Sequence, residues 1–369
     1  MNGLVLSGGG ARAAYQAGVL SYIAEKAPEV TFPIIAGVSA GAINAAFIAG
    51  HRGTPPETLR ALSECWMSLT IDGVFNANLG KIGLEGARWL WTFGSGGKQI
   101  KGFLDTSPLR KFLGKALDLD GIDANLEAGR LRAVGLSATR WATGQTVTFV
   151  QGADGIPTWD RARRCGTRTR IRVDHVLASG SLPLIFPAVR IDGEFYGDGS
   201  IRQAAPLAPA IHLGADRLLA IATRYAATLD EIRARATTGY PPPAHLIGML
   251  FNTIFLDTLD GDAERLERIN RVLEALPPGA PNPEGLKPIE LLVVRPSRDL
   301  GEIAGEFRGK LPYSLRFLMR GLGVKRVQGA DLLSYLIFER PFISRVIDLG
   351  YEDAMSQWPE IERFLAGED

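Results

Sequence analysis

The sequence predicts an α/β fold built on a parallel or mixed sheet. Two observations support this prediction. Short apolar runs at 3–6 and 31–36 are each followed by a glycine-containing turn and then by a helical segment. A strand, a turn and a helix repeated in this order are typical of a sheet whose strands are covered by helices.

The first two helices of this pattern follow from spacing and composition. Residues 13–25 carry Ala14, Ala17, Leu20 and Ile23 on one side, which is the period of an amphipathic helix. Residues 41–50 are small and apolar throughout, as a buried helix requires.

Later segments add further strands and helices. We expect strands at 132–139, 145–150, 217–224 and 289–294, a helix at 207–213, and strand-like pairing around Asp192 and Gly193. We expect a mostly helical insertion at 51–130 and a helical, lid-like segment at 228–288. We expect a helical closing segment at 301–369. Since no long polar linker divides the chain, we expect one domain over 1–369, with the core motifs in 1–225.

Composition excludes several classes of function. The 41 basic and 40 acidic residues leave a net charge of +1, which gives no general attraction to nucleic acid. The four histidines are not spaced as metal ligands, so we expect neither a metal nor another cofactor. The cysteines, Cys65 and Cys165, predict free thiols in a reducing compartment.

The chain also lacks the patterns of secretion and membrane insertion. No basic segment followed by a long apolar run opens the sequence, and no apolar stretch approaches the roughly 20 residues of a membrane span. We therefore expect a soluble, cytoplasmic protein that is at most peripheral on a membrane.

The motif most closely tied to chemistry runs from Gly37 to Gly41 as Gly-Val-Ser-Ala-Gly. A serine on a sharp turn between a strand and a helix projects its hydroxyl clear of the backbone, and the turn needs glycine two positions to either side. Ser39 is therefore a candidate nucleophile, with Gly37 and Gly41 completing the nucleophile elbow. Taken alone, the motif fits a turn serine or a helix N-cap equally well.

A second glycine-rich loop, Gly8-Gly9-Gly10-Ala11-Arg12, also joins a strand to a helix. Its N–H groups suit either a phosphate cradle or an oxyanion hole. No Gly-Lys-Ser/Thr follows, and the spacing differs from a dinucleotide fingerprint. Beside a nucleophilic serine, an oxyanion hole is the favoured interpretation, and each donor in such a hole contributes about 3–4 kcal/mol.

A nucleophilic serine needs a base, and the candidates are His212, His245 and Asp198. The histidines lie in a helical stretch and after a proline run, where ordinary structural roles are more common. Asp198 lies between Gly197 and Gly199, directly after a strand-like segment. Glycine on both sides lets the backbone approach another element, although Asp-Gly alone is usually a turn.

Taken together, these motifs resemble the patatin-like phospholipases. The resemblance rests on GGGARAAYQAGVL, GVSAG and GDGS in that order, and on ASGSLPLIFPAVRIDGEFYGDGS before the aspartate. It covers about residues 1–225, and YLIFERPFISRVIDLGYEDA resembles the closing segment of bacterial members. The resemblance implies a three-layer α/β/α patatin-like fold, with a central mostly parallel sheet and helical insertions.

The resemblance also implies the site and the reaction. Ser39 is then the nucleophile and Asp198 the base, with no histidine in the mechanism. Gly8, Gly9, Gly10 and Arg12 line the oxyanion hole, mainly through main-chain N–H groups. The family usually has Gly or Ala where this chain has Ser200 after Asp198-Gly199; serine is small, so we expect the turn to survive.

The implied activity is hydrolysis of fatty acyl esters of phospholipids or related lipids through an acyl-enzyme intermediate. Candidates for an apolar groove or lid are Trp89–Phe93, flanked by Lys98 and Lys101, and the run 246–256. Ordinary core packing explains both stretches as well. The alternatives are a general carboxylesterase or thioesterase with the same dyad, a non-catalytic lipid-binding protein, and a phosphate or nucleotide binder using the glycine loop.

Overall fold

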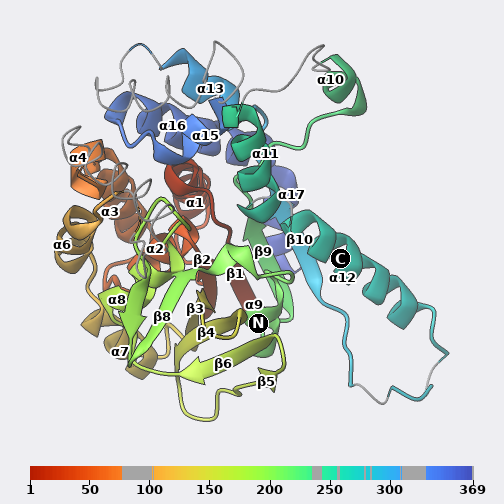
Figure 1. Cartoon of the computed structure of the whole chain (residues 1–369). Helices are drawn as coiled ribbons and strands as arrows, with labels where there is room; N and C mark the ends of the chain where they lie inside the picture. The colour runs from red at the N-terminus through yellow and green to blue at the C-terminus, as the bar shows by residue number, and fades with distance from the viewer. Residues whose placement is uncertain are drawn as a thin grey trace.

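A mostly parallel sheet flanked by helices forms the centre of the computed structural model (Figure 1). The structure describes residues 1–76, 102, 104–234, 243–255, 258–277, 280–282, 285–307, 309 and 330–367. In these residues the sheet order is β10-β9-β1-β2-β3-β4-β6-β5, and β8 joins β3 and β7. The strands are β1 (Asn2–Leu6), β2 (Ile34–Val38), β3 (Ala133–Arg140), β4 (Gln145–Gly152), β5 (Asp160–Arg161), β6 (Arg164–Arg168), β7 (Val189–Ile191), β8 (Glu194–Asp198), β9 (Arg217–Ile221) and β10 (Glu290–Val294).

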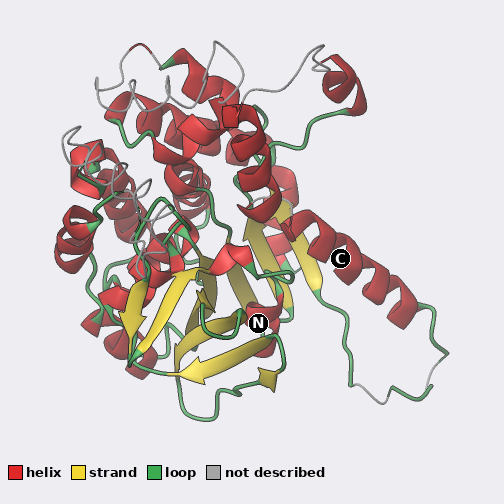
Figure 2. Cartoon of the chain, in the orientation of Figure 1, coloured by secondary structure: helices red, strands yellow, loops and turns green. Residues whose placement is uncertain are grey.

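The first half of that order, from β10 to β3, is parallel throughout, whereas β4 and β8 both run antiparallel to β3. Figure 2 shows the strands in the lower part of the view and most helices crowded over the upper part. The helices are α1 (Ala14–Lys26), α2 (Ala40–Gly50), α3 (Pro55–Ser68), α4 (Ile71–Val74), α6 (Ser107–Ala116), α7 (Asp120–Glu127), α8 (Val173–Ser179), α9 (Ala208–His212), α10 (Leu229–Ala234), α11 (Pro243–Phe255), α12 (Thr258–Glu274), α13 (Leu300–Glu306), α15 (Ala330–Leu336), α16 (Arg340–Ser356) and α17 (Trp358–Ala366).

Alternating side chains of the strands feed two apolar cores, one on each face of the sheet. Leu4 and Leu6 of β1 belong to the larger core, which α1, α2, α3, α8 and α16 cover. Val5 belongs to the second core, which α9 and α12 cover. Because successive side chains of a strand point to opposite faces, this alternation produces the helix–sheet–helix layering that the sequence predicts.

Most elements confirm the sequence prediction, with small shifts at their ends. The second strand begins at Ile34 and runs to Val38, although the apolar run 31–36 predicted an earlier start. The helices of 51–130, 228–288 and 301–369 are present where the structure describes those segments. The sequence analysis missed β5 and β6, because both are short, rich in arginine and largely exposed.

Helix length and composition bear on membrane insertion. Across the described part of the chain, no helix is both long enough and apolar enough to span a bilayer.

Candidate active site

Ser39 occupies the turn between β2 and α2 in a strained conformation. Its φ of 55° and ψ of −130° are rare for a residue with a side chain. A Cβ atom on Gly37 would lie 2.5 Å from the Gly41 carbonyl oxygen, and one on Gly41 would lie 2.2 Å from the Leu6 oxygen. The turn therefore requires both glycines, which is the local geometry of a nucleophile elbow.

The Ser39 hydroxyl meets the Asp198 carboxylate directly. Ser39 Oγ donates a hydrogen bond to Asp198 Oδ2 at 2.6 Å, across 159 residues of sequence. Asp198 Oδ1 accepts a second bond, from the Ser200 N–H, at 2.9 Å. Asp198 has no exposed surface and Ser39 retains 2%. The two residues that sequence reasoning selected as nucleophile and base are thus a buried, hydrogen-bonded pair.

One edge of β3 brings these two residues together. Along this edge β2 pairs with β3 as far as Val38 opposite Ser137, and the next β3 residue, Ala138, pairs with Asp198 of β8. Strand β2 ends where Ser39 turns away, and β8 then continues the same edge from the opposite direction. The last residue of β8 therefore lies beside the residue that follows β2.

Two side chains that the sequence did not point to, those of Ser179 and Thr139, hold this junction. Ser179 Oγ accepts the Ser39 N–H at 2.9 Å and donates to the Ser137 carbonyl at 2.6 Å. Thr139 Oγ1 donates to the Asp198 carbonyl at 2.8 Å. Ser179 lies in the ASGSLP segment that precedes Asp198. The sequence marks this segment, but it does not indicate that the Ser179 hydroxyl holds the junction.

Burial changes the acidity of Asp198. It raises the pKa of this carboxyl from 3.8 to about 7, and the hydrogen bonds from Ser39 and Ser200 act in the opposite direction. A carboxylate with a pKa near 7 is a stronger base than an exposed aspartate, and it is deprotonated above neutral pH. Asp198 therefore has the acid–base properties that removal of a serine proton requires.

The glycine loop lies against Ser39. A Cβ atom on Gly8 would be 2.9 Å from the Ser39 Cβ, so a side chain there would displace the serine. Gly9 and Gly10 have φ values of 146° and 57°, which favour glycine. Within the described residues, the N–H groups of Gly8, Gly9 and Gly10 donate to no protein acceptor. They remain available for a ligand oxygen.

A buried polar network fixes this loop to the helices behind it. Gln16 Nε2 donates to the Ser7 carbonyl at 2.9 Å, and its Oε1 accepts from Asn44 Nδ2 at 2.8 Å. Asn44 Oδ1 in turn accepts from Trp66 Nε1 at 2.7 Å. The network connects the strand that leads into the glycine loop with the helix that follows Ser39, and sequence reasoning did not find it.

Arg12 differs from the expected role. Its main-chain N–H donates to the Gly9 carbonyl at 3.2 Å and so is already occupied. Its buried side chain reaches α15, where Nε donates to Ser334 Oγ and a terminal nitrogen lies 3.0 Å from Asp331 Oδ1. The guanidinium also lies 4.6 Å from the centre of the Tyr335 ring. Arg12 therefore anchors the loop to the closing segment of the chain.

A narrow apolar cavity of about 40 Å³ opens beside Ser39. Gly10 and Ser39 lie on its wall, so the glycine loop and the hydroxyl face the same space. Its other lining residues are almost all apolar: Ala40, Ile43, Leu69, Val74, Leu109, Leu113, Val176, Leu177, Gly180, Leu182, Phe186, Tyr335 and Phe338. Such a wall suits apolar ligand atoms and offers few hydrogen-bonding groups to a polar ligand.

Of the groove and lid candidates from sequence, only part of the run 246–256 belongs to the described residues. Trp89–Phe93, Lys98 and Lys101 are outside the described residues. In α11, Leu246, Met249 and Leu250 are exposed, and none of them lines the cavity at Ser39.

Of the two candidate histidines, only His212 has a described side chain, and it lies away from Ser39. His212 ends α9 and stacks on Trp159, with the ring centres 4.7 Å apart, on the opposite face of the sheet from α2. The side chain of His245 lies outside the described residues, although its backbone belongs to α11. Within the described part, no group of three His, Cys, Asp or Glu side chains is arranged to hold a metal ion.

Fold and site together define a class: an α/β protein with a nucleophile elbow and a buried Ser–Asp pair. The family comparison agrees, because the family model described as patatin-like phospholipase matches residues 4–211, more than half of the chain. The chain therefore belongs to the patatin-like phospholipase family. A comparison with curated protein sequences found no significant match.

Solved structures show more distant likeness. Human GIVD cytosolic phospholipase A2, in complex with methyl gamma-linolenyl fluorophosphonate, shares 13% identity, with a TM-score of 0.47. That alignment covers 100% of this chain and 58% of the human chain. VipD from Legionella pneumophila shares 11% identity, with a TM-score of 0.33, over 100% of this chain and 67% of VipD. This chain thus spans about three fifths of the length of the phospholipase A2.

The raised pKa of Asp198 predicts a pH-dependent stability. Between about pH 4 and pH 7 the folded chain keeps a proton that the unfolded chain has lost, so this contribution is full below pH 4 and is lost as pH rises through 7. Relative to the parent chain, Asp198→Asn should gain roughly 2.5 kcal/mol in free energy of unfolding between pH 5 and pH 8. Urea unfolding at both pH values measures this gain.

Ser39→Ala is the matched control, because it keeps the carboxyl and removes a hydrogen bond that lowers its pKa. This variant should retain the loss of stability with rising pH, shifted to higher pH. An Asp198→Asn protein with the same pH dependence as the parent would contradict the assignment of the buried charge.

Proposed function

We propose that this chain is a serine lipid acyl hydrolase that cleaves fatty acyl esters through an acyl-enzyme intermediate. The observation that carries the proposal is the 2.6 Å hydrogen bond from Ser39 Oγ to Asp198 Oδ2 within a nucleophile elbow. Membership of the patatin-like phospholipase family and the apolar wall beside Ser39 support a lipid substrate.

The acylation step follows from the direction of that hydrogen bond. Ser39 Oγ attacks the ester carbonyl carbon while its proton passes to Asp198 Oδ2. Negative charge then develops on the carbonyl oxygen, and the unoccupied N–H groups of the glycine loop are the proposed donors to it. The N-terminus of α2, which begins at Ala40, adds its positive dipole end. Collapse expels the alcohol, which takes the proton from Asp198, and leaves the acyl group on Ser39.

Deacylation uses the same groups in reverse order. Asp198, again a carboxylate, accepts a proton from water as the water oxygen attacks the acyl carbonyl. The intermediate then releases the fatty acid, and the proton returns from Asp198 to Ser39 Oγ. A single base therefore serves both halves of the reaction, and no histidine is needed.

The proposal predicts that both members of the pair are essential. Ser39→Ala and Asp198→Asn should each lower kcat for hydrolysis of a long-chain p-nitrophenyl ester by about 10³-fold or more. A fluorophosphonate probe should label the parent chain on Ser39, with peptide mapping as the measurement. His212→Ala, which removes a half-buried polar side chain on the other face of the sheet from α2, is the control and should retain activity. Full activity in Asp198→Asn together with its loss in His212→Ala would replace the dyad by a histidine-based triad.

The pH profile tests the role of Asp198 independently of mutation. Since burial raises the pKa of Asp198 to about 7, kcat/KM should rise about tenfold per pH unit below pH 7 and level off above pH 7. Initial rates between pH 5 and pH 9 on an uncharged ester give the profile. Activity that stays constant down to pH 5 would show that a group with a lower pKa takes the proton.

The alternatives differ in the acyl group they accept. A general carboxylesterase or thioesterase would use the same dyad but favour short acyl chains, whereas a lipid-binding protein would show no turnover. The apolar cavity favours long chains, so kcat/KM should increase from p-nitrophenyl acetate to the octanoate or longer esters. A series of esters of increasing chain length measures this preference, and a steady decrease with length would favour the general esterase.

A further inference from the structure

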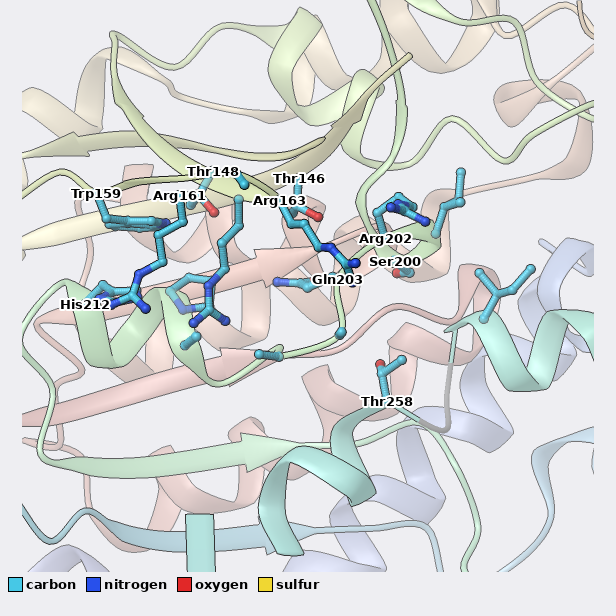
Figure 3. Close-up of a pocket in the computed structure, with 18 of the residues that line it drawn as sticks. Thr146, Thr148, Trp159, Arg161, Arg163, Ser200, Arg202, Gln203, His212 and Thr258 are labelled. Carbon is cyan, nitrogen blue, oxygen red and sulfur yellow. The ribbon is translucent and has the colours of Figure 1, made fainter. Parts of the chain in front are cut away.

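A second and much larger cavity, of about 710 Å³, lies on the α9 face of the sheet. Figure 3 shows Arg161 and Arg163 reaching into it from the β5–β6 side, with Trp159 and His212 at one end and Ser200 and Arg202 at the other. It shares no lining residue with the cavity at Ser39. We call it the arginine cavity, after Arg161, Arg163, Arg164 and Arg202 on its wall.

The wall of the arginine cavity carries positive charge that is not held in ion pairs. None of its four arginines forms an ion pair with a carboxylate of the described chain, and no Asp or Glu lines the cavity. Arg202 Nε donates only to the neutral carbonyl of Gly144. The adjacent stretch behaves differently, since Arg168, Arg170 and Arg172 all pair with aspartates.

Neighbouring titratable groups do not neutralise this charge. His212 stays uncharged at neutral pH, because burial and then the nearby Arg164 and Arg161 lower its pKa. Asp262, behind the wall, accepts the Leu207 N–H and pairs with Arg265, and it attracts Arg164 only at longer range. Asp160 precedes Arg161 but is absent from the lining. The cavity therefore attracts anions at physiological pH.

Buried polar atoms on the same wall also have no protein partner. Thr146 and Gln203 are 5% and 6% exposed, and in the described structure Thr146 Oγ1 and Gln203 Oε1 make no hydrogen bond. His212 Nε2 is a third such atom. A buried polar atom without a partner costs free energy, which a ligand hydrogen bond recovers. Thr146 Oγ1 can donate to an anion, whereas Gln203 Oε1 can only accept, for example from a ligand hydroxyl. The unused hydrogen-bonding capacity and the unpaired charge thus lie in one cavity.

We propose that the arginine cavity binds a phosphate ester, either a free phosphorylated small molecule or a phospholipid headgroup. Guanidinium groups match phosphate oxygens in geometry and charge, and several of them around one cavity select a multiply charged anion. The volume lies within the range of small-molecule sites. Trp159, stacked on His212, offers an aromatic surface to the organic part of the ligand.

Ser200 gives the arginine cavity a connection to the catalytic pair. It lines the cavity, and its N–H donates to Asp198 Oδ1 at 2.9 Å. The binding proposal nevertheless stands apart from the proposed hydrolase, because it depends on the charge and shape of this cavity and not on turnover.

Binding to the Ser39→Ala protein tests the proposal without hydrolysis. Calorimetry with inorganic pyrophosphate, in a phosphate-free buffer, probes the free-ligand source. Cosedimentation with phosphatidylcholine vesicles, with and without phosphatidic acid, probes the headgroup source. The variant Arg161→Gln/Arg163→Gln/Arg164→Gln should weaken binding of the preferred probe at least about tenfold. Arg163→Gln alone changes one exposed side chain and should give a smaller loss in the same direction.

The matched control is Arg168→Gln/Arg170→Gln/Arg172→Gln. It removes the same charge from the same stretch of chain, but from arginines that pair with surface aspartates. The affinity of this control for the same probe should stay within about twofold of the parent, because its substituted arginines do not line the cavity. The loss of their exposed ion pairs should change the stability of the fold little. Pyrophosphate binding without vesicle binding identifies a free ligand, and arginine-dependent binding to phosphatidic acid identifies a headgroup. No binding of either probe, or an equal loss in both triple variants, would overturn the proposal.

Discussion

The hydrogen bond between Ser39 and Asp198 depends on the one edge of β3 that two strands share. Strand β2 occupies this edge up to Ser137, and β8 occupies it from Ala138 onward, in the opposite direction. Several contacts at the junction hold β2 and β8 in these positions. A Cβ atom on Gly199 would lie 2.2 Å from the Ser137 carbonyl oxygen, so glycine after Asp198 is a steric requirement. Ser179 then bridges the two sides, because its hydroxyl contacts both Ser39 and Ser137.

The same arrangement stores unfavourable free energy at the site. Ser39 keeps a positive φ, and Asp198 is removed from water with no cationic partner among the residues that the structure describes. Both features oppose folding, and two hydrophobic cores packed on opposite faces of the sheet offset them. An exposed aspartate would cost less free energy on folding, but its carboxylate would be a weaker base. Burial links the reactivity of the pair to its instability, since the same desolvation causes both.

Local motifs were sufficient to select the two side chains that form the buried Ser39–Asp198 pair and to predict the strand–turn–helix units around them. Gly37, Gly41 and Gly199 act on the backbone within a few residues of themselves, so the turns that they allow can be predicted from sequence. The supporting contacts have no such local signal. Arg12 contacts Ser334 across 322 positions, and neither segment contains a sequence pattern that predicts this contact. The arginine cavity escaped prediction for the same reason, because β4, the β5–β6 turn, the segment after Asp198 and α9 become neighbours only in the folded chain.

The short segment from Asp198 to Gln203 joins the two cavities. Asp198 faces Ser39, whereas Ser200, Arg202 and Gln203 face the arginine cavity. The cavities have no lining residue in common, so an anion held by the arginines does not lie in the space beside Ser39. This segment is a direct structural link between the arginine cavity and the Ser39–Asp198 pair. The contact available is the Ser200 N–H on Asp198 Oδ1, which lowers the pKa of the base. Ser200 is thus the residue of this segment that lines the arginine cavity and also contacts Asp198.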